Sequence, residues 1–243
     1  MRLAGHHAIV TGGGTGIGAA IARALAADGA KLTLVGRRRE PLQEVAHDAM
    51  LVAPADVTVR NEVERAFALA REAQGPITIL VNNAGAAQGA PFAKVTEALW
   101  RDMLAVNLDG MFHCCQAALP DLLAAEAGRI VTVASMAGLH GFAYAAPYIA
   151  AKHGAVGLTR ALAAEYAKTG LKVNVVCPGF VDSEMTGSSI ANIVAKPGRD
   201  VEEARAELAR LNPSGRLIAP EEVAAVVLDL VVSDRNGEAV EIA

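Results

Sequence analysis

The sequence predicts an α/β protein in which a single doubly wound parallel sheet is flanked by helices on both faces. Short aliphatic runs alternate with helical stretches along the chain, as in repeated βα units. Hydrophobic residues make up 53% of the chain and aromatic residues only 4%. This balance is typical of parallel sheets, whose strands are covered on both faces. The length allows one large domain or two small ones; without repeats or a linker, we expect one domain over residues 1–243.

Four of the expected strands lie in the N-terminal half. In chain order they read HAIVTG, KLTLVG, MLVAPADV and ITILVNNAG. The helix GIGAAIARALAADG follows the first strand, because Ile17, Ile21 and Leu25 recur at helical spacing and a Gly at position 29 ends the pattern. A second helix is expected to start near Pro41, and a third covers RNEVERAFALAREAQG.

The C-terminal half continues this alternation and then interrupts it. Helical segments are expected from about 97 to 125, followed by the strand RIVTVAS, the helix PYIAAKHGAVGLTRALAAEYAKTG and the strand KVNVVCPG. From 180 to about 217, Gly, Ser, Asn and Pro interrupt short helical pieces. The helix PEEVAAVVLDLVV and the short strand EAVEI complete the pattern. Ligands of doubly wound sheets bind at the carboxyl ends of the strands, so residues directly after the strands form the candidate site.

Composition and charge argue against several classes of partner. The net charge of -4 is spread along the chain without a basic block, so neither nucleic acid nor an anionic membrane is expected. No stretch is long and apolar enough to span a bilayer, and no charged leader precedes the first strand, so we expect a cytoplasmic protein. Cys114, Cys115 and Cys177 fit buried thiols rather than a disulfide framework, and no His or Cys spacing indicates a metal site.

A glycine-rich turn joins the first strand to the first helix. It contains Gly12, Gly14, Thr15, Gly16, Ile17 and Gly18. Glycine lets a ligand approach the backbone closely, and the N-terminus of the following helix offers N–H groups to a pyrophosphate. A flexible turn would explain a lone glycine motif as well. The position between a strand and an amphipathic helix, at the start of a βαβ unit, favours dinucleotide binding.

Tyr148 and Lys152 lie four residues apart in the long helix and therefore share one of its faces. The ordinary pKa of tyrosine, about 10, is too high for a good base near neutrality, and a neighbouring ammonium would lower it. The pair therefore predicts a phenol that can exchange a proton with a substrate. A helix with one tyrosine and one solvated lysine would explain the two residues alone equally well.

Several such motifs follow one another in a recognisable order. They are Thr-Gly-x-x-x-Gly-x-Gly from Thr11, NNAG from Asn82, Asn107 in MLAVNLDG, Ser135 after the fifth strand, the Tyr148 and Lys152 pair, and Pro178-Gly179 after the sixth. Together they resemble the short-chain dehydrogenase/reductase family over nearly the whole chain. The resemblance implies a Rossmann-like fold and an oxidoreductase that uses a nicotinamide cofactor.

The resemblance also implies roles for individual residues. Tyr148 would act as acid or base, Ser135 would orient the substrate carbonyl, and Lys152 would bind the ribose hydroxyls of the nicotinamide. Asn107 would hold a water that links the lysine to solvent. Besides the glycine-rich turn, the residues implied to bind the cofactor are Arg37, Arg38, Asp56, Val57, Asn83, Ala84, Gly85, Tyr148, Lys152, Pro178, Gly179, Val181 and Ser183. Ser183 stands where the family often has threonine.

The end of the second strand favours NADP over NAD. An acidic residue there would accept hydrogen bonds from the adenosine ribose, but Gly36 takes this place and Arg37 and Arg38 follow. Guanidinium groups match the geometry of a phosphate, and in the resembled family arginine at this position marks NADP enzymes. The family's other NADP marker is absent because Thr15 stands in its place, and a solvated basic turn would explain the arginines too. NAD therefore stays possible.

The substrate is expected to be a small-molecule ketone or alcohol. The stretches AAPYIAAKHGAVGLTRALAAEYAKTGLKVNVVCPGFV and NPSGRLIAPEEVA look like ketoreductases of 3-oxoacyl thioesters and aromatic polyketides. This favours a 3-oxoacyl group on coenzyme A or acyl carrier protein. The alternatives are another cyclic or aromatic secondary alcohol, or a binding protein that kept NADP and lost the chemistry.

The region from 183 to about 217 is expected to be a lid over the substrate. It contains Met185, Ile190, Ile193 and Val194, and the cations Lys196 and Arg199, which could meet an anionic group of the substrate or simply solvate a loop. His140, close to Ser135, could touch the substrate or be polar surface. The resemblance further implies a homo-oligomer, usually a tetramer. Members of the resembled family usually continue after the last strand with a glycine-rich tail that can close the pocket or form the subunit interface, whereas the sequence here reads GEAVEIA, which weakens both expectations.

Overall fold

A computed structural model of the chain describes residues 1–47, 50–194 and 199–243. Its strands form one seven-stranded sheet in the order β3-β2-β1-β4-β5-β6-β7. Every pair of neighbouring strands is parallel. The order runs outward from β1 in one direction and from β4 in the other, so the sheet has a topological switch point between these two strands. The predicted fold class is confirmed.

The elements follow the expected order. The strands are β1 (His7–Thr11), β2 (Lys31–Gly36), β3 (Met50–Pro54), β4 (Ile79–Asn82), β5 (Arg129–Val133), β6 (Lys172–Pro178) and β7 (Ala239–Ile242). The α-helices are α1 (Gly16–Ala27), α2 (Arg39–Val45), α3 (Arg60–Gln74), α4 (Glu97–Leu104), α5 (Gly110–Ala124), α6 (Ala146–Glu165), α7 (Glu184–Val194), α8 (Val201–Ala209) and α9 (Pro220–Val232). Two 3-10 turns, η1 (Phe92–Lys94) and η3 (Met136–Gly138), and a π-helical turn, η2 (Ala105–Asp109), lie between them.

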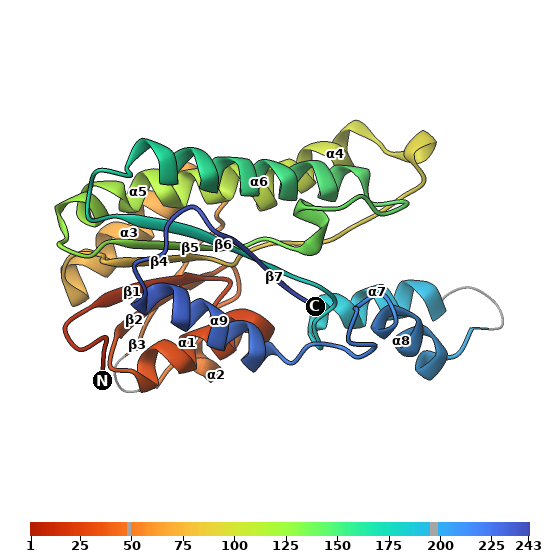
Figure 1. The fold of residues 1–243 in the computed structure, drawn as a ribbon, viewed down its shortest axis with the longest axis horizontal. Helices are drawn as coiled ribbons and strands as arrows, with labels where there is room; N and C mark the ends of the chain where they lie inside the picture. Colours follow the sequence, from red (N-terminus) through yellow and green to blue (C-terminus); the bar gives the residue numbers. More distant parts are fainter. Residues whose placement is uncertain (48–49, 195–198) are drawn as a thin grey trace.

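Helices cover both faces of the sheet (Figure 1). On one face α1, α2 and α9 pack against the strands, and Leu25 of α1 and Val227 of α9 share a core with Val10 of β1. On the other face α3, α5 and α6 pack, and Phe67 of α3 shares a second core with Ile9. Ile9 and Val10 enter different cores because successive side chains of a strand point to opposite faces. This double burial explains the aliphatic strands.

The segment after β6 is more regular than its sequence suggests. It contains α7 and α8, which lie beyond the carboxyl ends of the strands, at the right of Figure 1. Gly187 and the serines beside it are poor helix formers, yet they lie inside α7. Ile190 of α7 is buried against Ala204 and Leu208 of α8. The packing between the two helices therefore overrides the local preference.

No helix in the described part of the chain is both long and apolar enough to cross a membrane. Across the same residues, no group of three or more His, Cys, Asp and Glu side chains is placed to hold a metal ion. The three cysteines are buried and form no disulfide, as expected.

Candidate active site

The glycine-rich turn leaves no room for side chains. Gly12 has a φ of 65° and Gly16 a φ of 48°, values that residues with a Cβ rarely adopt. A Cβ on Gly18 would collide with the carbonyl oxygen of Gly12, so α1 packs directly on the turn. Thr15, the N-cap of α1, makes no side-chain capping bond, and the first turn contains no acidic residue. The N–H groups at this end of α1 are therefore available to an anion such as a pyrophosphate.

The loop after β4 is tied to this turn. The hydroxyl of Thr11 accepts hydrogen bonds from the N–H groups of Asn83 and Ala84, each at 3.0 Å. The Asn83 side chain donates to the carbonyl oxygens of Thr11 (3.0 Å) and Gly12 (3.2 Å). A Cβ on Gly85 would lie 2.8 Å from Asn107 Oδ1 and 3.5 Å from Lys152 Nζ. This loop therefore connects the glycine-rich turn to the predicted catalytic residues.

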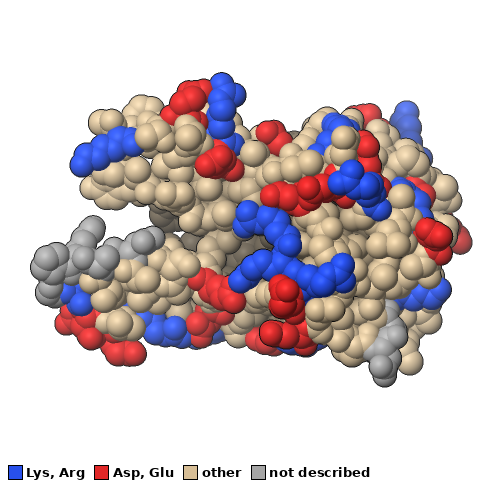
Figure 2. Space-filling model, turned by 180° about the vertical axis from the view of Figure 1, so that it is seen from behind, with Lys and Arg blue, Asp and Glu red and all other residues tan. Residues whose placement is uncertain are grey.

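Arg37 and Arg38 follow β2 and are exposed, as a phosphate site requires. Arg38 Nη2 lies 3.4 Å from Glu184 Oε2 at the start of α7, so an ion pair connects the end of β2 to the segment after β6. Figure 2 shows Lys and Arg side chains gathered beside a hollow near the middle of one face of the molecule.

Asp56 and Val57 lie in the loop after β3. Asp56 Oδ1 accepts hydrogen bonds from the N–H (2.9 Å) and the hydroxyl (2.8 Å) of Thr58, which closes a tight turn. Val57 is buried, and its carbonyl oxygen lies 3.0 Å from His113 Nδ1 of α5. Both residues thus hold this loop in place at the carboxyl edge of the sheet.

The residues after β6 reach the glycine-rich turn. The N–H of Gly179, directly after Pro178, donates to the carbonyl oxygen of Ile242 in β7 at 2.8 Å, and Val181 forms an isolated parallel bridge with Ile218. A Cβ on Gly16 would lie 3.4 Å from the Cβ of Ser183. Ser183 is therefore next to the predicted pyrophosphate site.

Asn107 lies in the π-helical turn η2, between α4 and α5. Such wide turns are frequent at functional sites. The side chain is buried; its Nδ2 donates to the carbonyl oxygens of Ala86 (2.9 Å) and Met103 (3.0 Å), and its Oδ1 accepts from the N–H of Ala86 at 3.3 Å. Asn107 therefore clamps the loop after β4 beside Lys152. The sequence predicts a helix here, but not its widened turn.

Ser135 and Tyr148 come together near the carboxyl end of β5. Ser135 is the N-cap of η3, and its hydroxyl accepts from the N–H of Ala137 at 3.1 Å. Burial raises the pKa of Tyr148, and a hydrogen bond from Ser135 acts in the opposite direction. The prediction that Lys152 lowers the pKa of this phenol below its ordinary value is wrong for the protein chain by itself. Lys152 Nζ lies 5.7 Å from the centre of the Tyr148 ring, and the loss of water around the phenol dominates.

Lys152 is buried, with only 5% of its surface exposed. Its Nζ donates to the carbonyl oxygen of Val133, the last residue of β5, at 3.2 Å. Burial lowers the pKa of Lys152 to about 8, and the Cys177 thiol nearby has a smaller, opposite effect. The amine therefore lies on the same side as Tyr148 and is held near its titration range at neutral pH.

The apolar residues of the predicted lid mostly face one another. Ile190 is buried between α7 and α8, and Ile193 and Val194 pack against the same cluster, whereas Met185 is 39% exposed. Arg199 forms an ion pair with Glu207 of α8. Lys196 lies outside the described residues.

His140 lies on the surface near the last strand. Its Nε2 is 3.4 Å from Glu241 Oε1 of β7, and the side chain is exposed. His140 is therefore paired with Glu241 on the surface of the protein.

Asn212 is a residue near the site that the sequence analysis does not identify, because its role depends on partners elsewhere in the chain. Asn212 is buried, and its Oδ1 accepts from the N–H of Phe180 at 2.8 Å while its Nδ2 donates to the carbonyl oxygens of Phe180 (2.9 Å) and Arg216 (2.7 Å). Asn212 therefore fixes the path of the chain directly after Pro178-Gly179. Its only signal in the sequence is an asparagine before proline, which is typical of any turn.

Comparison with known proteins agrees with this arrangement. The model of the short chain dehydrogenase family matches residues 6–193. The chain is 40% identical over 236 residues to galactitol 2-dehydrogenase (L-tagatose-forming) of Cereibacter sphaeroides, covering 95% of this chain and 89% of that protein. It is 36% identical over 235 residues to D-beta-hydroxybutyrate dehydrogenase of Cupriavidus necator, covering 94% of this chain and 91% of that protein.

A solved structure is similar over nearly the whole chain. The crystal structure of a variant of actinorhodin polyketide ketoreductase with NADPH superimposes with a TM-score of 0.93 at 36% sequence identity, covering 98% of this chain and 95% of that one. The chain belongs to the short-chain dehydrogenase family. It is an oxidoreductase of the class that acts on CH–OH groups.

Proposed function

We propose that this protein interconverts a ketone and a secondary alcohol with NADP(H), and that its ketone is a 3-oxoacyl thioester of coenzyme A or acyl carrier protein. The observation that carries the proposal is the meeting of Ser135, Tyr148 and Lys152 at the carboxyl end of β5. The first turn of α1, which follows the glycine-rich turn, contains no acidic residue.

The glycine-rich turn fits a nicotinamide dinucleotide. A Cβ on Gly12 would lie 2.9 Å from Asn83 Nδ2. The turn therefore packs closely on the loop after β4, and a larger residue at this position would push the two apart. Arg37 and Arg38 supply guanidinium groups for a 2′-phosphate, and no carboxylate at Gly36 repels it. When bound, the nicotinamide supplies or accepts the hydride.

Tyr148 is suited to donating a proton to the substrate oxygen. Burial raises the pKa of the phenol, so in the chain by itself Tyr148 holds the proton that a ketone substrate would receive. The Ser135 hydroxyl is placed beside this phenol to orient the same oxygen. Lys152 would bind the ribose hydroxyls and, as an ammonium, stabilise the phenolate left after proton transfer.

The substrate class rests on similarity. One neighbour is named as a polyketide ketoreductase and one relative for a β-hydroxy acid, and both names fit reduction at the third carbon of an acyl chain. Another relative is named for a sugar alcohol, so a polyol is the competing substrate.

The proposal is tested by replacing the phenol and by comparing substrates. Tyr148→Phe is expected to lower kcat for a 3-oxoacyl thioester by about 10²–10⁴-fold, the usual contribution of a general acid. Tyr166→Phe, at the other end of α6, is the matched control and should keep full activity. A screen of acyl thioesters, polyols and simple secondary alcohols is then run with both cofactors. Faster turnover of polyols would replace the substrate assignment, and NADPH binding without any turnover would favour a binding protein.

The choice of cofactor is tested at Arg37. Arg37→Asp is expected to weaken NADPH binding at least about tenfold while changing NADH binding little, because it replaces a charge-assisted phosphate contact with repulsion. Arg39→Asp, which makes the same charge change at the start of α2, is the control. Equal losses for NADPH and NADH in the Arg37 variant would mean that this residue does not bind the phosphate. Isothermal titration with each cofactor measures the difference.

We also propose that residues 183–217 close over the substrate and that the protein assembles as a homotetramer. The ion pair between Arg38, a predicted cofactor residue, and Glu184 at the start of α7 supports this lid. Phe112 and Leu123 of α5 are each 39% exposed, which is typical of a surface that a second subunit covers. Sedimentation that shows a monomer at all concentrations would reject the assembly.

A further inference from the structure

A small cavity lies inside the protein beneath Lys152. It has a volume of about 10 Å³, which is close to the smallest space that holds one water molecule. Its polar lining comes from the strands β1, β4 and β5, the turn η2 and the helix α6. The polar side chains are Thr11, Asn82, Asn107, Thr132 and Lys152. A cavity with several polar groups is a site for water, whereas an apolar cavity of this size would stay dry.

Two of these side chains have their hydrogen bonds satisfied by the protein. The Thr11 hydroxyl accepts two backbone N–H groups and donates to the carbonyl oxygen of Val81 at 3.4 Å. Both amide hydrogens of Asn107 are used by the carbonyl oxygens of Ala86 and Met103. Neither group therefore has a donor left for a molecule in the cavity.

The Thr132 hydroxyl donates to Met111 Sδ at 3.9 Å and accepts from the Thr159 hydroxyl at 3.4 Å. The unmet hydrogen-bonding capacity therefore lies on Asn82 and Lys152. Asn82 is 5% exposed, and its Oδ1 is buried without a hydrogen-bond donor from any described residue. The Lys152 ammonium has three donors, of which one is used by Val133. A buried amide oxygen without a partner is rare in proteins, and a nearby ammonium with unused donors is its natural complement.

We propose that one internal water molecule occupies this cavity and bridges Asn82 Oδ1 to Lys152 Nζ, so that Asn82 is a positioning residue for the lysine. The catalytic consequence rests on the proposed function, in which Lys152 supports the proton transfer of Tyr148. The water would accept a hydrogen bond from the ammonium and donate one to the amide oxygen. It would thereby hold the amine below the helix α6 and leave its last donor for a ligand.

The bridge does not depend on which way the Asn82 amide is turned. Asn82 Nδ2 lies 3.3 Å from Cys115 Sγ. If the oxygen and nitrogen were exchanged, Nδ2 would be the amide atom without a partner. Water both donates and accepts, so it satisfies either orientation.

The titratable groups near Lys152 in the described part of the chain are neutral. They are Tyr148 on the same helix, Cys177 on β6 and Cys114 on α5, which lines the cavity. Burial raises the pKa of each of these groups, to about 11 for Cys177, so all are neutral near pH 7. No carboxylate among the described residues forms an ion pair with Lys152. Among the described residues, the ammonium is therefore held by a neutral acceptor and by no opposite charge. One added hydrogen bond to water should then raise the pKa of Lys152 noticeably.

A high-resolution crystal structure of the full chain tests the site directly. We expect an ordered water within hydrogen-bond distance of both Asn82 and Lys152 Nζ. A cavity without density, or a water that contacts Lys152 and Asn107 but not Asn82, would overturn the proposal. Neither result depends on the substrate or on turnover, so failure here is distinct from failure of the proposed function.

The pKa of Lys152 tests the effect of the bridge. It is measured by NMR titration of the protein with ¹³C-labelled lysine, with the Lys152 signal assigned by its loss in Lys152→Met. Asn82→Leu should lower the pKa of Lys152 by roughly one unit, because the charged amine loses one hydrogen-bonded partner. Asn82→Asp, which restores an acceptor, should bring this pKa back to or above the wild-type value.

Cys115→Ala is the matched control for these variants. It removes the partner of Asn82 Nδ2 without changing a residue that lines the cavity. We expect the pKa of Lys152 to stay at its wild-type value in this variant. A shift as large as that of Asn82→Leu would mean that general loosening of the strand end, and not the water, moves the lysine. An unchanged pKa in all three variants would equally reject the bridge.

Discussion

Two buried cations lie at opposite ends of β5, and their surroundings differ. Arg129 is the first residue of the strand, and its guanidinium donates to the carbonyl oxygens of Val231 (3.1 Å), Gly128 (3.0 Å) and Gly170 (3.3 Å). It also contacts Asp234 Oδ1 at 3.4 Å. At the other end, the Lys152 ammonium has a single acceptor among the described residues, the carbonyl oxygen of Val133.

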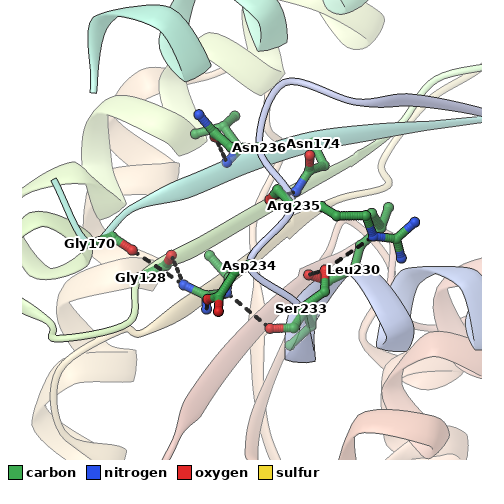
Figure 3. Close-up of polar contacts among 11 residues, drawn as sticks. Gly128, Gly170, Asn174, Leu230, Ser233, Asp234, Arg235 and Asn236 are labelled. Carbon is green, nitrogen blue, oxygen red and sulfur yellow. Dashed lines mark hydrogen bonds and ion pairs between the residues drawn. The ribbon is translucent and has the colours of Figure 1, made fainter. Parts of the chain in front are cut away.

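Figure 3 labels several residues that contact Arg129, among them Gly128, Gly170 and Asp234. Gly128, Gly170 and Asp234 gather at the amino end of the sheet, and Asn174 and Arg235 join the same region by further polar contacts. The acceptors come from the segments before β5 and before β6, and from the last turn of α9 and the residues after it. Arg129 therefore joins three distant parts of the chain.

The contrast separates a structural cation from one that we propose to be functional. A buried charge is tolerable when hydrogen bonds replace its lost water, and Arg129 has such a set. Lys152 keeps donors unused, and burial lowers its pKa to about 8. The fold thus spends stability to hold a reactive amine at the carboxyl end of the sheet, where the ligand of a doubly wound fold binds.

The largest change in stability is expected when Arg129 is replaced. Arg129→Met should lower the free energy of unfolding by about 3–5 kcal/mol, because buried carbonyl oxygens lose their donors. The activity of the folded fraction should stay at the wild-type level. Urea unfolding followed by circular dichroism measures the loss, and Arg129→Lys, which keeps one charged donor group, should lose less. A loss of activity without a loss of stability would show that this end of the sheet is not purely structural.

Replacing Lys152 is expected to change the free energy of unfolding in the opposite direction. Lys152→Met should abolish turnover yet raise the free energy of unfolding by about 2 kcal/mol at pH 7, since it removes a buried charge whose pKa is lowered to about 8. Urea unfolding of the same preparations measures it. A destabilised methionine variant would mean that the ammonium is better satisfied than its contacts indicate.

The same pKa shift predicts a pH dependence. The pKa of Lys152 is about 8 in the folded chain and 10.5 for an ordinary lysine, so the unfolded chain binds more protons between these values. The stability of the wild type should therefore rise with pH across this window relative to Lys152→Met. The advantage of the variant should be full below about pH 8 and vanish above about pH 10.5. A pH-independent difference would contradict the lowered pKa.

The smallest effect is expected at Asp234, the one carboxylate in the described part of the chain that contacts Arg129. Its side chain is 96% exposed, so the ion pair is screened by solvent. Asp234→Ala should move the urea midpoint by less than the Arg129→Lys change. A loss as large as that of Arg129→Met would show that the ion pair, and not the carbonyl oxygens, holds the guanidinium.

Much of the fold could be predicted because its signals are local. The run KVNVVCPG reads as a strand that ends at proline and glycine, and β6 ends at Pro178. The glycine-rich turn also shows locally, since residues other than glycine rarely adopt the φ of Gly12. The spacing of Tyr148 and Lys152 placed the two side chains on one helix face, and the ammonium does lie near the ring.

The remaining features depend on partners far away in the chain. Asn82 is one of two asparagines in NNAG, and nothing in the motif shows that its oxygen is buried without a donor. Arg129 begins a strand and would be expected to reach solvent, but its acceptors lie up to 105 positions away. The direction of the Tyr148 pKa was wrong for the same reason, because burial is a property of the packed molecule.

By itself the sequence determined the order of strands and helices, the backbone freedom of the first turn and the residue types at the strand ends. These depend on side-chain periodicity and on the conformational range of single residues. The tertiary structure alone decided which polar groups lose water and which of them find partners. Desolvation depends on every segment packed around a group, and that sum exists only after the chain has folded.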